Sequence, residues 1–290
     1  MTTKMVSAKD ISELRARTGA GMMDCKAALE EAGGNMDLAV DILRKKGIAK
    51  AEKRGGRSAS QGLVVVASHL AGTDVSMLEL NCETDFVART EDFIGLAREL
   101  AALAEREAPA GVHAGAVLDG LAFRGSTVAD IVKQVSGKTG EAMTVKRVAR
   151  FRQPAGTVQS YLHHNGQVAV LVDVEGPAGD ALVALAREVA LHVASADPVG
   201  VNDSDIPADQ IERERRIAEE QVAAEGKPEN IRPKIVEGKI RKYIAERTLL
   251  SQPFVKDETK KVSDLVADAA KQAGGPVIVR RFARFKVGEA

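Results

Sequence analysis

Apolar residues recur at helical spacing three times within residues 1–54, and each recurrence predicts a short helix. The first helix is expected to start after Ser7, the second to run from about Met22 to Glu31, and the third to end at Gly47, a residue typical of helix C-termini. Leu38 is expected on the buried stripe of the third helix. So small a core indicates a binding module attached to a larger body.

Beyond residue 62 the pattern changes to the alternation typical of β-strands, and the strands come in hairpins. Each predicted hairpin is followed by helical segments and then by a closing strand. The expected hairpin strands are residues 63–68 with 75–82, and 157–163 with 167–174. Helices are expected to begin near Thr90 and Thr127 and to span 180–196; a charged helical excursion covers 204–229, and the closing strands are 143–152 and 277–286.

The two closing strands resemble each other in sequence. Val145-Lys146-Arg147-Val148-Ala149-Arg150-Phe151 and Val279-Arg280-Arg281-Phe282-Ala283-Arg284-Phe285 share five of seven residues. Together with the repeated hairpins, this similarity predicts an internal duplication. We therefore expect an α+β protein with a three-helix module at 1–54 and two related α+β subdomains, at 55–152 and 153–290. The second subdomain is expected to carry a helical-hairpin insertion at 204–229, where Gly226-Lys227-Pro228 turns the chain back into a helix that runs through Ser251.

The composition narrows the class of protein. Of the 290 residues, 44% are hydrophobic and 28% are charged, as in ordinary globular chains. Lys and Arg together number 41, as do Asp and Glu, so a net charge of zero gives no global attraction to nucleic acid or to an anionic membrane. An aromatic content of 3% argues against a platform for stacking bases.

Other features of the sequence indicate the cellular compartment of the protein. The first six residues, Met1 to Val6, form no apolar signal segment, and no apolar run approaches the length of a membrane span. Two cysteines, Cys25 and Cys82, suit a reducing compartment. We expect a cytoplasmic protein.

One strongly basic run extends from Lys45 to Arg57. A solvated linker helix is favoured over a nucleic-acid contact, because the run contains no aromatic residue. Gly55-Gly56 near its end indicates a hinge.

Motifs for catalysis are weak. Gly137-Lys138-Thr139 resembles the end of a phosphate-binding loop, but Val132 stands where that motif requires glycine, so a helix-ending turn is favoured. Cys82 has no histidine at a spacing that selects a base, and a small buried cysteine is the commoner case. The side chains of His163-His164 are expected to point to opposite faces, which disfavours a shared metal. The chain therefore lacks a convincing enzyme site.

The stretch from Leu78 to Arg89 begins as a strand and changes to polar, turn-forming residues at Asn81. Phe86 follows, next to Asp85, in a segment too polar to lie in a core. Two interpretations stay open: the ring caps the local core, or it is presented to a partner.

Several stretches resemble one known family. Glu13 to Lys26 and Glu79 to Ala88 closely resemble the two signature stretches of bacterial translation elongation factor Ts. Five shorter stretches match in the same order: Ser160 to His163, Gly226 to Glu229, Ile235 to Gly238, Gln252 to Val255 and Arg284 to Glu289. The resemblance implies a guanine-nucleotide exchange factor for elongation factor Tu, with an N-terminal module similar to the ubiquitin-associated three-helix type.

The resemblance also implies a site. In this family the tip at Thr84 to Val87 is pushed into the partner's nucleotide domain near its magnesium ion, with Phe86 as the wedge and Asp85 as its polar companion. No cofactor or metal site is implied for this chain, because the nucleotide and Mg²⁺ belong to the partner. The further contact positions that the resemblance implies are Arg15, Met22, Met23 and His163.

Other expectations concern partners and departures from the family. The partner is expected in GDP-bound and nucleotide-free forms, the second subdomain is expected to meet its third domain, and self-association is expected to use the helical insertion. Many members continue into an extra C-terminal helix, whereas this chain stops at Ala290, so that contact is expected to be absent. Lys261 stands where the family usually has threonine.

Overall fold

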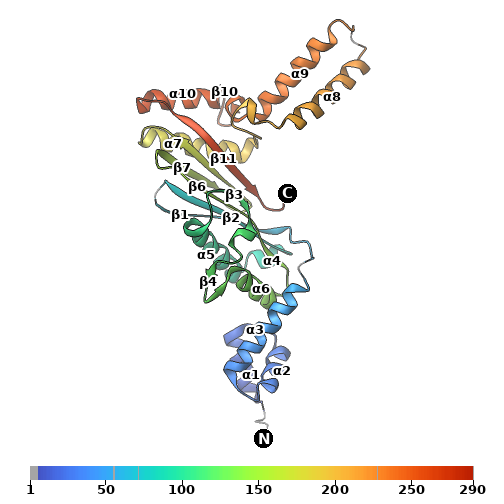
Figure 1. Cartoon of the computed structure of the whole chain (residues 1–290), viewed down its shortest axis with the longest axis vertical. Helices are drawn as coiled ribbons and strands as arrows, with labels where there is room; N and C mark the ends of the chain where they lie inside the picture. The colour runs from blue at the N-terminus through green and yellow to red at the C-terminus, as the bar shows by residue number, and fades with distance from the viewer. Residues whose placement is uncertain (1–5, 55, 71, 227, 290) are drawn as a thin grey trace. The chain divides into compact units, whose positions relative to one another are not determined.

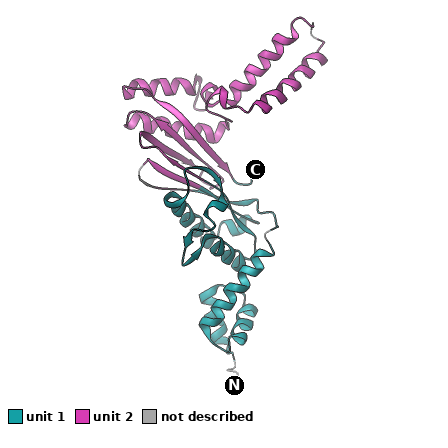
Figure 2. Cartoon of the chain, in the orientation of Figure 1, with its two compact units in different colours: residues 1–65, 78–148, 287–290 teal, residues 66–77, 149–286 magenta. Residues whose placement is uncertain are grey.

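The computed structural model describes residues 6–54, 56–70, 72–226 and 228–289, with its helices and strands labelled in Figure 1. The chain divides into two compact units (Figure 2): unit 1 contains residues 1–65, 78–148 and 287–290, and unit 2 contains residues 66–77 and 149–286. The predicted domain boundaries stay predictions. The expectations for the first five residues, for Gly55 in the hinge and for Ala290 lie outside the described residues.

Three short helices form the N-terminal module, as the periodicity predicts. They are α1 (Ala8–Thr18), α2 (Met22–Glu31) and α3 (Met36–Glu52). Ser7 caps α1 through a reciprocal capping box with Asp10, which satisfies two N–H groups at the helix start. The three helices share a small core in which Leu14, Cys25 and Leu29 are fully buried.

Helix α3 continues through Gly47 to Glu52, so the prediction that it ends at this glycine is wrong. The reason is packing: Gly47 lies against Gly137 of α6 (Val128–Thr139), where the absence of two side chains lets the helices approach closely. The expectation that Leu38 is buried is also wrong, because this side chain is 48% exposed.

The basic run that starts at Lys45 is helical as far as Glu52, as expected for a linker helix. Several of its cations pair with carboxylates of unit 1: Lys46 with Glu31, Lys50 with Asp24, and Arg57 with Glu83. Paired cations have less charge to offer a phosphate, so these contacts favour the structural interpretation over a nucleic-acid surface.

A four-stranded sheet in the order β1-β2-β6-β3 contains the first residues of the stretch from Leu78 to Arg89. Its strands are β1 (Gln61–Leu70), β2 (Asp74–Cys82), β6 (Met143–Arg152) and β3 (Gly111–Ala114). Every residue of β2 is buried. Helix α5 (Glu91–Glu107) is capped by Thr90, as predicted, and buries Phe93, Leu96 and Leu100. A 3₁₀ turn (Gly115–Leu118) and a two-stranded ribbon of β4 (Ala122–Phe123) and β5 (Ser126–Thr127) precede α6.

Unit 2 contains a three-stranded antiparallel sheet in the order β11-β8-β7. The strands β7 (Gly156–Leu162) and β8 (Val168–Glu175) form the second predicted hairpin, and β11 (Ile278–Lys286) is the second closing strand. Helices α7 (Asp180–Ala196) and α10 (Val262–Ala273) share its core, which includes Val172, Val189 and Val262. The strands β9 (Pro253–Phe254) and β10 (Asp257–Lys261) form a small ribbon.

The helical excursion is a hairpin of α8 (Ala208–Ala224) and α9 (Arg232–Arg247), seen in Figure 1. Its own small core contains Ala218, Val222, Val236 and Ile240. The predicted helical hairpin is therefore present, and α9 is the helix expected after Pro228. This helix ends at Arg247 instead of Ser251, because the chain continues as a 3₁₀ turn (Leu249–Ser251). The predicted bounds of the insertion, 204–229, stay a prediction.

The similar closing strands make similar contacts. In unit 1, Arg147 of β6 donates from Nε to Glu79 of β2 at 2.7 Å. In unit 2, Arg281 of β11 donates from Nε to Asp173 of β8 at 2.9 Å. Both acidic partners are buried, and so are the phenylalanines that end the repeat, Phe151 and Phe285. These parallels agree with a duplication, while the division into two related subdomains stays a prediction.

The fold class is α+β, as predicted: helices accompany small sheets along the chain. Within the described ranges, no helix is both long and apolar enough to span a bilayer.

Candidate partner-binding site

Strand β2 ends at Cys82, and a single helical turn, α4 (Asp85–Ala88), follows it. Thr84 caps this turn, and its Oγ1 accepts a hydrogen bond from the Val87 N–H. Ala88 is buried below the turn, whereas the Phe86 side chain is 81% exposed. The interpretation that Phe86 caps the local core is therefore wrong, and the aromatic ring is presented outward.

Asp85 and Val87 flank the exposed ring and are half-buried. The Asp85 carboxylate pairs with Arg89 one turn later, at 2.9 Å. Both members of this pair are substantially solvent-exposed, so it adds little to stability and can be exchanged for another partner at small cost. The tip thus combines one apolar ring with an acidic group available for contact.

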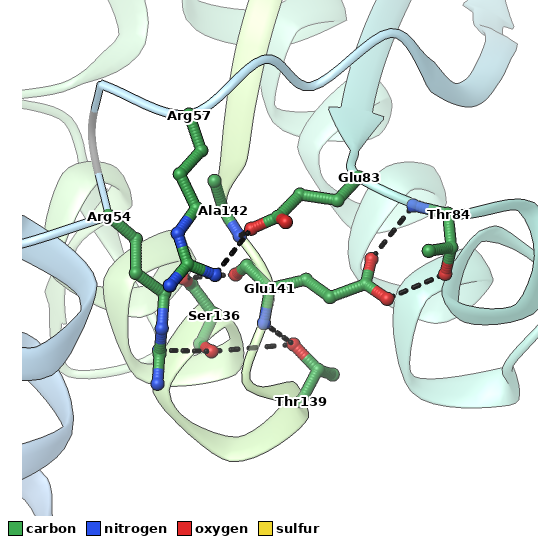
Figure 3. Close-up of polar contacts among 8 residues, drawn as sticks. All are labelled: Arg54, Arg57, Glu83, Thr84, Ser136, Thr139, Glu141 and Ala142. Carbon is green, nitrogen blue, oxygen red and sulfur yellow. Dashed lines mark hydrogen bonds and ion pairs between the residues drawn. The ribbon is translucent and has the colours of Figure 1, made fainter.

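The base of the tip is bound to the turn that joins α6 to β6, as Figure 3 shows. Glu141 accepts two hydrogen bonds from Thr84: one from the backbone N–H at 2.9 Å and one from the hydroxyl at 2.6 Å. The neighbours of these two residues make a second contact, in which the carboxylate comes from the tip's side: Glu83 accepts from the backbone N–H of Ala142 at 2.7 Å. Each turn therefore supplies a carboxylate to the other.

The charge of Glu83 is favoured by its surroundings. The Ala142 N–H and the Arg57 guanidinium hold the pKa of the Glu83 carboxyl below its ordinary value. This carboxylate therefore stays ionised at neutral pH and keeps both contacts. Glu141 carries no signal in the sequence, because a glutamate after a helix-ending glycine belongs to no recognisable motif.

Cys82 is buried beneath the tip, and its Sγ donates to the carbonyl of Thr84 at 3.1 Å. Burial, followed by the nearby charge of Glu141, raises the pKa of the Cys82 thiol to about 12. The nucleophilic thiolate is scarcely populated at neutral pH. The expectation of a small buried cysteine is confirmed, and a thiol-enzyme interpretation loses its support.

The expected contact residues of the N-terminal module lie on its surface. Met22 is 57% exposed and Met23 is 75% exposed at the start of α2. Arg15 of α1 and Met22 line the same shallow depression, together with Ser12, Ala16 and Gly19. The structure therefore brings Arg15 and Met22 together. The exposed Leu38 of α3 is an apolar residue of this module that the periodicity placed inside.

His163 follows strand β7 in unit 2. Its Nδ1 lies 2.8 Å from the hydroxyl of Tyr161, and its ring centroid lies 4.3 Å from that of His164. The expectation that the two histidines point to opposite faces is wrong, because the chain has left the strand and turns there. Leu162, beside them, is 47% exposed and adds apolar surface.

The other motifs do not form chemical sites. Gly137-Lys138-Thr139 lies at the C-terminal end of α6, as the turn interpretation requires, and Lys138 pairs with Asp92. In the part of the chain that the structure describes, no group of three or more His, Cys, Asp or Glu residues is placed to hold a metal ion.

Comparison with known proteins gives a consistent result. The model of a family described as "Elongation factor TS" matches residues 83–289. The chain is 43% identical to elongation factor Ts of Chlorobium phaeobacteroides (strain BS1) over 284 residues, which cover 98% of this chain and 99% of the relative. It is also 43% identical to elongation factor Ts of Aquifex aeolicus (strain VF5), with 98% of each chain covered. It is 40% identical to elongation factor Ts of Clostridium perfringens (strain SM101 / Type A), with 98% of this chain and 94% of the relative covered.

The family model includes Glu83, the tip and the chain as far as Glu289, and the relatives extend the match over the N-terminal module. The matched stretches thus include both exposed surfaces described above. The chain belongs to the elongation factor Ts family.

Proposed function

We propose that this protein is a guanine-nucleotide exchange factor for elongation factor Tu in translation elongation, acting in the cytoplasm and supplying no catalytic chemistry of its own. The observation that carries the proposal is the exposure of Phe86, which is 81% accessible in the helical turn that follows a fully buried strand. A large apolar ring exposed in this way is typical of an anchor that enters a pocket of another protein.

The mechanism is displacement of the partner's metal ion. Mg²⁺ requires a nearly ideal octahedral set of oxygen ligands and is usually held partly by nucleotide phosphates. Phe86 acts as a wedge beside that site, and the Asp85 carboxylate accompanies it. A small movement of the ligands then weakens both the ion and the nucleotide. Because coupling between sites is reciprocal, the nucleotide weakens the binding of this protein by the same factor.

The wedge is insufficient for a large acceleration. Full burial of one phenylalanine side chain yields about 1.5–3 kcal/mol. Since about 1.4 kcal/mol corresponds to a factor of ten, Phe86 accounts for roughly one to two decades of nucleotide release. Any acceleration beyond that requires additional contacts that are stronger in the nucleotide-free complex.

The N-terminal module and unit 2 supply these additional contacts in our proposal. Met22 and Met23 present flexible apolar side chains that adapt to a partner surface, and Arg15 adds a charge beside them. His163 and the exposed Leu162 form a second contact region in unit 2. The partner is bound in both GDP-bound and nucleotide-free states, and its third domain meets the second subdomain.

Self-association through the α8–α9 hairpin is a separate part of the proposal. The hairpin has its own small core, and Ile217 and Ile231 leave apolar surface on its outside, at 41% and 40% exposure. Sedimentation of the purified protein across a range of concentrations tests this point independently of exchange.

Release of a fluorescent GDP from elongation factor Tu tests the proposed function. Release is followed after addition of excess unlabelled GDP, with and without this protein. The expected result is a faster release that saturates with the concentration of this protein. An unchanged release rate at saturating protein would overturn the proposal.

A further inference from the structure

We propose that Glu141 is a positioning residue for exchange: its carboxylate fixes Thr84 and thereby the direction in which Phe86 is presented. The inference rests on the proposed function and deepens it, since it assigns the control of the tip to a residue of a different turn. Glu141 does not itself lie within the tip and is 57 residues away from Thr84 along the chain.

Both oxygens of the Glu141 carboxylate engage the same residue. Oε2 accepts from the Thr84 backbone N–H at 2.9 Å, and Oε1 accepts from the Thr84 hydroxyl at 2.6 Å. The hydroxyl proton is thus directed toward Glu141, while the lone pairs of the same oxygen face the N–H of Val87. Hydrogen bonds to an ionised carboxylate are roughly twice as strong as neutral ones. Glu141 therefore fixes the cap that starts the single turn carrying Phe86.

The reciprocal contact prevents the tip from pivoting about Thr84. Glu83 accepts from the Ala142 N–H at 2.7 Å, so neighbouring residues on each turn are bonded to neighbouring residues on the other (Figure 3). Two adjacent bonds in opposite directions resist rotation of one turn relative to the other, which a single bond does not.

Glu141 is itself held in place from the side of α6. Its carbonyl accepts from the Ser136 hydroxyl, and Gly140, with φ +84°, ends α6 immediately before it. The carbonyl of Ser136 accepts from Nη1 of Arg54 at 3.3 Å, just beyond the end of α3. The two bonds between the turns, Glu141 with Thr84 and Glu83 with Ala142, form a clamp that is thus connected to the α3–α6 contact. The tip is also bonded to its own flanks, since Cys82 donates to the Thr84 carbonyl and Thr90 donates to the Val87 carbonyl.

The first test measures positioning directly. In Glu141→Ala, the Thr84 amide loses its acceptor, and its hydrogen exchange with solvent is expected to be at least ~10-fold faster, as for the loss of one charge-assisted bond. Amides of β2 keep their rates. An unchanged hydrogen-exchange rate of the Thr84 amide would overturn the inference, whatever the rate of GDP release. Glu107→Ala, at the exposed end of α5, is the matched control and is expected to leave both sets of amides unchanged.

The second test connects positioning to function through a double-mutant cycle. The release of fluorescent GDP is measured with wild type, Glu141→Ala, Phe86→Ala and the double variant. If Glu141 acts through Phe86, its substitution slows release about tenfold in the wild-type background and has no further effect in Phe86→Ala. Affinity for the nucleotide-free partner is expected to fall by up to about the same factor, because the ring that is mispositioned is buried in that complex.

The cycle separates the two proposals. If Phe86→Ala releases GDP at the wild-type rate, the wedge mechanism fails, and the role of Glu141 in exchange fails with it. If Phe86→Ala is slow but Glu141→Ala is normal, or if their effects multiply, the wedge survives and the inference about Glu141 is overturned. Glu141→Gln guards against a folding defect. Its amide accepts from the Thr84 N–H and donates to the hydroxyl, so it is expected to restore at least half of the lost rate.

Discussion

The Cα of Gly47 in α3 lies so close to Gly137 in α6 that a Cβ on Gly137 would stand 2.8 Å from it. This distance is shorter than side chains tolerate, and the atoms that it would meet belong to the backbone of α3, which does not move aside easily. The contact joins the third helix of the N-terminal module to the helix that ends at the Glu141 turn. It therefore belongs to the support of the tip.

Gly137→Ala is expected to destabilise unit 1 by about 1–3 kcal/mol, since overfilling a close contact shifts backbone. This loss of stability is the opposite of the usual effect, because replacing a glycine inside a helix by alanine ordinarily stabilises the helix by about 0.5–1 kcal/mol. Gly95→Ala in α5 is the control: a Cβ there meets nothing within 4 Å. Urea denaturation is the measurement, and midpoints that rise for both variants contradict the close packing.

Phe86→Ala is expected to slow GDP release by roughly one to two decades while changing stability by less than about 0.5 kcal/mol, because the ring is exposed in the free protein. Val112→Ala, at another exposed apolar position of unit 1, is the control and should leave release unchanged. Stopped-flow release and thermal denaturation check the two halves of the prediction. A variant with wild-type release kinetics rules out the wedge.

Substituting Met22 and Met23 together by alanine is expected to weaken association with the nucleotide-free partner and also to lower the maximal rate of release, because contacts that favour the nucleotide-free complex are lost. Full burial of each side chain against a partner is worth about 1.5–3 kcal/mol, so burial of even half of the combined surface corresponds to a rise of about tenfold or more in the dissociation constant. Calorimetric titration of the nucleotide-free partner measures the affinity. These substitutions are sharper than deletion of residues 1–54, because deletion would also uncover α6. An unchanged affinity speaks against the module as a contact surface.

Removal of Mg²⁺ tests the order of events at the partner's site. With EDTA present, the partner has already lost the ion that the wedge displaces, so GDP release without this protein is fast. The acceleration by this protein is expected to shrink by about tenfold or more, the share assigned to Phe86. Wild type and Phe86→Ala should then release GDP at similar rates. An acceleration that is equally large with and without Mg²⁺ is incompatible with metal displacement.

His192 predicts a dependence of stability on pH. It is fully buried, with Nε2 2.8 Å from Oε1 of Gln252 and Nδ1 accepting from the Val255 N–H. Burial lowers the pKa of His192 below its ordinary value of 6.5. The unfolded chain therefore takes up a proton before the folded one does, so stability is fully present above about pH 6.5 and falls as the pH decreases toward the lower pKa of the folded state.

For a single proton the slope approaches about 1.4 kcal/mol per pH unit within that range. His192→Gln removes the titrating group, so the difference in unfolding free energy between wild type and variant should narrow from pH 7.5 to pH 5.5. Urea titrations at several pH values measure this difference. A constant difference across the range means that the depressed pKa is absent.

The elements that the sequence predicts well are those whose pattern is complete within one segment. Helix 180–196 and strand 143–152 have the predicted bounds, because their apolar periodicity and flanking breakers are local. Gly47 was misassigned because its role depends on Gly137, far away in the chain. The helix predicted to follow Pro228 is present as α9, although it ends at Arg247 and not at Ser251.

The candidate site was predictable to a similar extent. The polar turn after β2 placed Phe86 at a tip, but composition alone left its exposure open, and the family resemblance supplied its expected role. The clamp was not predictable, since the contact between Glu141 and Thr84 joins two turns that become neighbours only through the pairing of strands in the sheet. Short side-chain bonds of this kind leave no periodic trace in a sequence.

Strand β2 is buried along its whole length, and the ring of Phe86 stands only a few residues beyond its end. The backbone that carries this ring is already fixed in the free protein by the bonds of Thr84, so contact with a partner requires little further ordering of the chain. Association should then proceed at the rate of ordinary collisions between preformed surfaces, without a slow folding step. The lifetime of the complex, set by how quickly it comes apart, is the quantity that substitutions in the supporting turn would tune.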